Sequence, residues 1–127
     1  MNEFQKIIDS YSSDLSLNKS ISSSEAEKRA GRFLEAMAKI TDLRHVFSES
    51  KIKFTTVQAA VYSEALSKGT AKTMTENKVT AEASAEYSGA REDLERIEND
   101  LAYLKAYWDI FMAAHVFYRQ IAKGEQF

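Results

Sequence analysis

Twelve positions between residues 83 and 122 follow one another at alternating steps of four and three residues. Eleven of the twelve are apolar or aromatic: Ala83, Tyr87, Ala90, Leu94, Ile97, Leu101, Leu104, Trp108, Phe111, His115, Tyr118 and Ala122. A helix with close to 3.5 residues per turn places all of them on one side, and a repeat of this length is typical of a coiled coil. The spacing therefore predicts a long helix that packs against a partner along this seam.

A second row of large apolar residues lies upstream and indicates a second long helix. Its members recur every seven residues: Phe33, Ile40, Phe47, Phe54 and Val61. A partial second row consists of Ala36, Leu43 and Val57 and is interrupted at Ser50 and Glu64. The chain has no proline and only four glycines, so helix breakers are rare. Long uninterrupted helices are expected.

Short sequence signals set the ends of these helices. The stretch 24–27, Ser-Glu-Ala-Glu, is typical of a capping box and predicts a helix over 24–68. Gly69 is expected to end that helix in the left-handed conformation. The stretch 73–76, Thr-Met-Thr-Glu, is a second capping box and predicts a helix over 73–123. Because the turn between the helices is short, they are expected to be antiparallel.

The N-terminal residues 1–20 predict a short helix followed by a linker. Five apolar residues fall on one helical face: Phe4, Ile7, Ile8, Tyr11 and Leu15. Eight serines between Ser10 and Ser24 then indicate a flexible connection. The whole chain, 1–127, is thus predicted to be a single all-α domain, a coiled-coil-like antiparallel helical hairpin with a short N-terminal helix.

Composition excludes several kinds of chemistry. The absence of cysteine rules out disulfides and thiolate catalysis. His45 and His115 lie on different predicted helices without metal-ligand spacing, and His115 on the seam is interpreted as a residue that sets register. The acids of 92–100 scatter around one helix and are interpreted as a solvated face. We expect no enzymatic activity, no metal and no cofactor.

Segments for secretion or membrane insertion are not expected. Residues 1–10 lack the apolar core of a signal peptide, and the longest apolar run, 110–117, is far below the roughly 20 residues of a membrane span. A cytoplasmic protein is predicted.

The C-terminal stretch concentrates aromatic residues. Seven of the fourteen aromatics lie there: Tyr103, Tyr107, Trp108, Phe111, Phe117, Tyr118 and Phe127. Apolar side chains also lie off the seam, so one partner helix cannot cover them all. One interpretation is an intramolecular core closed by the first short helix. The interpretation we prefer is a homo-oligomer interface formed by Leu101, Leu104, Trp108, Phe111, His115 and Tyr118.

The middle segment 51–82 carries five basic and three acidic residues (+2) in a chain of net charge -2. Its lysines alternate with threonines, a composition that suits contact with phosphates independent of base sequence. The predicted nucleic-acid-binding residues are Lys51, Lys53, Lys68, Lys72 and Lys78. A solvated helix face is the alternative, although oligomerisation would concentrate the positive charge.

The order of these features resembles the UvsY-like phage recombination mediator family. The resemblance covers roughly residues 25–122: a helix ending at 65–70 (Ala-Leu-Ser-Lys-Gly-Thr), a Lys/Thr-rich restart over 72–80, the stretch 85–90 (Ala-Glu-Tyr-Ser-Gly-Ala), the helix 94–108 and the late Arg119. It implies an all-helical protomer that forms a ring-like oligomer and binds single-stranded DNA. It also implies that the protein helps a RecA-like recombinase to replace the single-strand-binding protein.

Two functions are therefore expected. The first is a recombination mediator that acts in DNA recombination and repair without making or breaking a bond. The alternative is a helical oligomeric scaffold or adaptor, structural or for host takeover, that does not bind nucleic acid.

Overall fold

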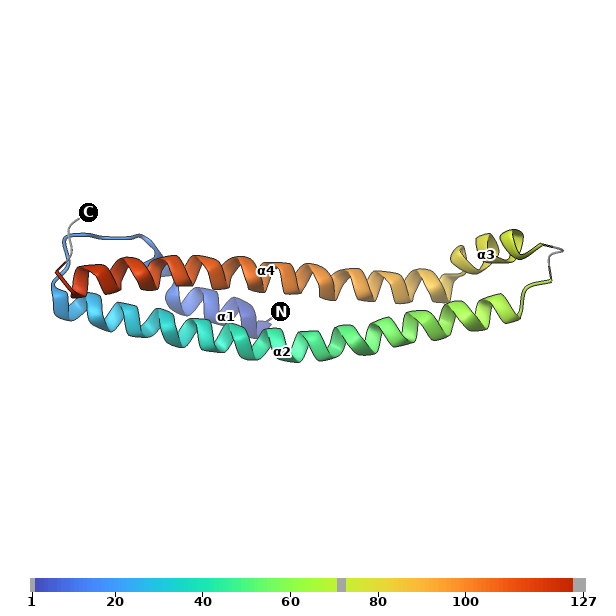
Figure 1. Cartoon of the computed structure of the whole chain (residues 1–127), viewed down its shortest axis with the longest axis horizontal. Coiled ribbons are helices and arrows are strands. Elements are labelled where there is room, and N and C mark those ends of the chain that lie inside the picture. The colour runs from blue at the N-terminus through green and yellow to red at the C-terminus, as the bar shows by residue number, and fades with distance from the viewer. Residues whose placement is uncertain (1, 71–72, 125–127) are drawn as a thin grey trace. The chain divides into compact units, whose positions relative to one another are not determined.

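The computed structural model describes residues 2–70 and 73–124, and the regular elements in these residues are helices (Figure 1). In chain order they are α1 (Asn2–Tyr11), the 3₁₀-helix η1 (Ser12–Leu15), α2 (Ser23–Ser67), α3 (Met74–Glu82) and α4 (Ala85–Ala122). The all-α prediction is confirmed, and α2 and α4 are the two long helices that the apolar rows indicated.

The described chain divides into two compact units, and both long helices contribute to each. The first unit comprises residues 1–45 and 102–127, and the second comprises residues 46–101. In the first unit Phe33 packs on Phe111 and Arg29 bonds to Tyr118. In the second, the rings of Tyr62 and Tyr87 are 5.3 Å apart. In the first unit, later residues of α2 contact earlier residues of α4, which confirms that the two helices are antiparallel there.

The core of the first unit contains the largest fully buried side chains, namely Phe33, Ile40, Leu104, Phe111 and Tyr118. Helix α1 completes this core, because Tyr11 lies 6.2 Å from Phe33 and 5.9 Å from Phe111, measured between ring centroids. Phe4 packs edge-on against Tyr107 at 5.4 Å. The short N-terminal helix therefore covers the rings of Phe33, Tyr107 and Phe111 within one chain.

The second unit has a thinner core. Its buried apolar residues among those described are Ala81, Ala90 and Ile97, whereas Phe47, Phe54 and Val61 are half-buried. Val57, which was expected on the partial second row, is 50% exposed. In an α-helix of 3.6 residues per turn, positions seven residues apart are offset by about 20° around the helix axis. A row of such positions that begins at the buried Ala36 has therefore rotated off the contact face by Val57.

Two helix starts differ from the predictions. Helix α2 is capped by Ser22 and not Ser24, because the Ser22 hydroxyl accepts the Glu25 N–H at 3.1 Å. The predicted helix 73–123 is interrupted between α3 and α4, where the Ser84 hydroxyl accepts the Tyr87 N–H at 3.2 Å and begins a new helix. The cap expected at Thr73 is confirmed, since its hydroxyl accepts the Glu76 N–H.

Gly69 follows α2 as expected but for a different reason. Its φ is not positive, so the predicted left-handed conformation is wrong. A Cβ at this position would instead lie 2.5 Å from Oδ1 of Asn77 on α3. A larger residue at position 69 would therefore require the Asn77 side chain to shift.

No helix within 2–70 or 73–124 combines the length and apolarity that crossing a bilayer requires.

Candidate functional site

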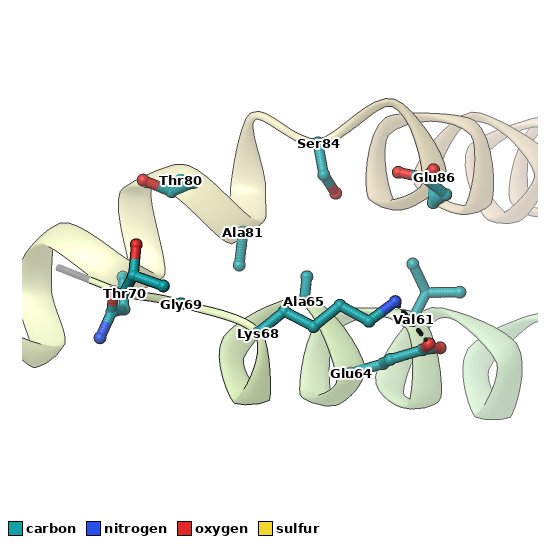
Figure 2. A pocket seen from close by; sticks show the side chains of 11 residues that line it. Val61, Glu64, Ala65, Lys68, Gly69, Thr70, Thr80, Ala81, Ser84 and Glu86 are labelled. Atoms are coloured by element: carbon teal, nitrogen blue, oxygen red, sulfur yellow. Dashed lines mark ion pairs between the residues drawn. The ribbon is translucent and has the colours of Figure 1, made fainter.

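The second unit contains a cavity of about 610 Å³, which falls within the usual size range of small-molecule sites. Figure 2 shows it from close by. Its lining residues are Val61, Glu64, Ala65, Lys68, Gly69, Thr70, Asn77, Thr80, Ala81, Ser84 and Glu86.

The cavity forms where the end of α2, helix α3 and the first turn of α4 face one another. Small side chains line it from two of these helices and from the break between α3 and α4: Ala65 on α2, Ala81 on α3, and Ser84 at the break. Larger residues at these positions would occupy the space. The cavity therefore depends on small residues and on the interruption at Ser84.

Two carboxylates and one ammonium set the charge of the cavity. Lys68 extends along α2 toward Glu64, and its Nζ lies 2.9 Å from the Glu64 Oε1 (Figure 2). The hydrogen bond to Glu64, and also the charge of Glu86, raise the pKa of Lys68. Lys68 is thus protonated at neutral pH and paired with Glu64. Among the described lining residues, Glu86 is the charged side chain without an ion-pair partner.

The neutral polar residues of the cavity have partly used their hydrogen-bonding capacity. The Thr80 hydroxyl donates to the Glu76 carbonyl at 3.0 Å. The Ser84 hydroxyl accepts from a backbone N–H and keeps its own proton for donation. The arrangement can bind a ligand that both accepts and donates hydrogen bonds.

The five predicted lysines have different surroundings. Lys68 lines the cavity, and Lys51 lies 4.0 Å from Glu98. Lys53 and Lys78 are exposed and form no ion pair within the described part of the chain. Lys72 lies outside the described residues. Two of the four described lysines are therefore already paired with acids.

Five of the six residues predicted as an oligomer interface belong to the first unit, and Leu101 belongs to the second. Leu104, Phe111 and Tyr118 are fully buried against the same chain, and Leu101, Trp108 and His115 are half-buried. Tyr11 of α1 contacts Phe111, and the Asp14 carbonyl of η1 accepts from Tyr118. The burial of the three residues inside one copy favours the intramolecular interpretation, and the interface interpretation stays a prediction.

His115 connects the two long helices. Its Nδ1 lies 2.8 Å from the Ala30 carbonyl oxygen, and since a carbonyl can only accept, Nδ1 carries the proton. This bond fixes the register of α4 on α2, in line with the structural role expected for a polar seam residue.

A polar cluster around Asp14 has no counterpart in the predictions. The Asp14 carboxylate is buried between Arg32, with which it forms an ion pair, and Arg29, whose Nε lies 3.7 Å away. Tyr118 donates to the Asp14 carbonyl at 2.8 Å and accepts from Arg29 at 3.2 Å. The hydrogen bond to Tyr118 raises the pKa of Arg29. Contacts this distant along the chain leave no local sequence signal.

Within the described residues, no three side chains of His, Cys, Asp or Glu gather in a way that could hold a metal ion. Comparisons of the chain with protein-family models, curated proteins and solved structures give no match.

Proposed function

We propose that the protein is an oligomeric single-stranded-DNA-binding recombination mediator that helps a RecA-like recombinase to replace the single-strand-binding protein. The observation that carries this proposal is that Lys53 and Lys78, in the second unit, are exposed and form no ion pair among the described residues. Ammonium groups in this state can bind phosphates without first breaking an internal ion pair.

The ion pairs reduce the number of lysines that are available to bind DNA. Lys51 and Lys68 would have to leave Glu98 and Glu64 before they could bind a phosphate. Lys53 and Lys78 are therefore the principal contacts of the proposal, together with Lys72, which lies outside the described residues. A protomer with so few contacts binds DNA weakly, so tight binding requires several copies on one strand.

Self-association supplies those copies. Helix α4 exposes large apolar side chains in the first unit, among them Tyr103 at 60% and Ile110 at 43%. These residues take the interface role in place of the buried Leu104, Phe111 and Tyr118. The oligomer then acts by mass action, because it holds DNA in a form that favours the recombinase over the competing coat protein.

The test is fluorescence anisotropy with a labelled oligo(dT) strand at low and moderate salt. We expect binding that weakens steeply with salt. The double variant Lys53→Gln/Lys78→Gln should bind less tightly and with a smaller salt slope, by about one unit per lost phosphate contact. Lys28→Gln is the matched control, since Lys28 is exposed on α2 in the first unit. No binding at low salt would overturn the proposal.

A helical scaffold or adaptor is the second candidate, and the charge of the second unit favours it. Residues 46–101 carry seven basic and ten acidic residues (-3), a balance that opposes the approach of phosphates. If the wild type forms an oligomer but does not bind DNA, this candidate replaces the mediator.

A further inference from the structure

The cavity of the second unit has a chemistry that DNA contact does not use. Its charged lining consists of Glu64, Lys68 and Glu86, and Lys68 is engaged with Glu64 at 2.9 Å. Glu86 forms no ion pair with a described residue. Among the described lining residues, the carboxylate of Glu86 is therefore the one charge without an ion-pair partner.

An apolar strip lies close to this carboxylate. Val61 and Ala65 on α2 and Ala81 on α3 line the cavity, and Figure 2 shows Val61 and Ala65 on the α2 side, with Ser84 and Glu86 on the facing side. A ligand that fits must combine an alkyl body with a positive group that donates hydrogen bonds. Among the described lining residues an anion is disfavoured, because two of them are carboxylates and the one ammonium, Lys68, is paired with Glu64.

We propose that this cavity binds an alkylammonium group, with the ammonium on Glu86 and the alkyl chain along Val61, Ala65 and Ala81. The Ser84 hydroxyl stays available as a second polar contact at the same end. Two sources share this chemistry: a free diamine, or a lysine side chain presented by another protein. The proposal does not depend on DNA binding, because Lys53 and Lys78 are not among the lining residues.

The experiment is a calorimetric titration of the full chain with butane-1,4-diamine, with butane-1,4-diol as the neutral ligand of the same length. The diamine is expected to bind and the diol is not. Glu86→Gln keeps the shape of the side chain but removes its charge, and should weaken diamine binding about fivefold, the effect of losing one partly exposed ion pair. Glu92→Gln is the matched control: Glu92 is an exposed acid on the same helix and does not line the cavity.

A second titration, with the capped peptide acetyl-Ala-Lys-Ala-amide, separates the two sources. Tighter binding of the peptide than of the diamine identifies a lysine side chain as the occupant, and the reverse identifies a free amine. The proposal is overturned if neither probe binds at millimolar concentration, if the diol binds as well as the diamine, or if Glu86→Gln and Glu92→Gln bind alike. None of these results alters the outcome of the DNA test.

Discussion

At the scale of single residues, Asp14 is the side chain that ties the N-terminal segment to both long helices. Its carboxylate meets Arg29 and Arg32 on α2, and its backbone carbonyl accepts from Tyr118 on α4. Arg32 also donates to the Ser10 carbonyl at 3.0 Å. The N-terminal segment is thus held by polar contacts at its end and by Phe4 and Tyr11 along its length.

Replacement Asp14→Ala is expected to lower the free energy of unfolding by about 1–2 kcal/mol. Two arginines would lose their shared acceptor, although their partial exposure lets water offset some of the loss. Urea denaturation measures the change. Asp9→Ala is the control, since Asp9 is exposed on α1 and should alter stability by less than about 0.5 kcal/mol. Equal effects of the two variants would contradict a special role for Asp14.

At the scale of elements, the break between α3 and α4 is where the seam pattern and the structure disagree. Ala83, the first seam position, is exposed, whereas every seam position from Tyr87 to Ala122 is buried or half-buried. The seam is therefore packed only within α4, and not at the position that precedes it. The Ser84 cap competes with a continuous helix, and side-chain hydrogen bonds of serine to the backbone favour such an interruption.

Replacement Ser84→Ala should lower the free energy of unfolding by about 1 kcal/mol, the usual cost of a lost helix cap. The expected cause is the loss of the bond between the Ser84 hydroxyl and the Tyr87 N–H. Ser88→Ala, within α4, serves as control and should be neutral or slightly stabilising because alanine favours helix. Chemical denaturation and circular dichroism decide the outcome. Higher stability and helicity in Ser84→Ala would mean that the chain prefers the continuous helix.

How well the sequence predicts a feature of this fold depends on how far apart in the chain the contacting residues are. The residues of the seven-residue row Ala90, Ile97, Leu104, Phe111 and Tyr118 are all buried, because apolar periodicity is a local property that any packed helix must satisfy. The segment that packs over Phe111 was less predictable. It contains Tyr11, which is a hundred positions away, so the periodicity of α4 alone could not show whether α1 or a second copy covers Phe111.

The candidate site was less predictable than the fold. Lys68 was singled out for its charge, but its partner Glu64 is one helical turn away on α2 and changes what it can bind. The cavity itself arises from small residues, including Ala65 and Ala81, whose sequence positions carry no signal of a cavity. These residues enclose an open space only in the folded chain, where α3 lies against α2.

At the scale of the whole molecule, two adjacent residues on α4 give different predictions for folding and for the proposed assembly. Phe111 is fully buried in the first unit, and Ile110 is 43% exposed. If α4 carries the self-association surface on its exposed face, the two positions must respond differently to mutation. A change at Phe111 acts on the protomer, and a change at Ile110 acts on the contact between copies.

Ile110→Glu should reduce the mass in solution, because a charge at an apolar contact between copies must be desolvated, and should leave the protomer folded. Phe111→Ala should instead destabilise the protomer by about 3–5 kcal/mol, the typical cost of removing a buried phenyl ring. Light scattering after size exclusion gives the mass, and thermal unfolding at several protein concentrations separates assembly from folding, since unfolding coupled to dissociation depends on concentration. Unchanged mass in Ile110→Glu would place any interface elsewhere. Reduced mass with unchanged stability in Phe111→Ala would instead return the interface to the buried seam, and would require α1 to leave its place over Phe33 and Phe111 when copies associate.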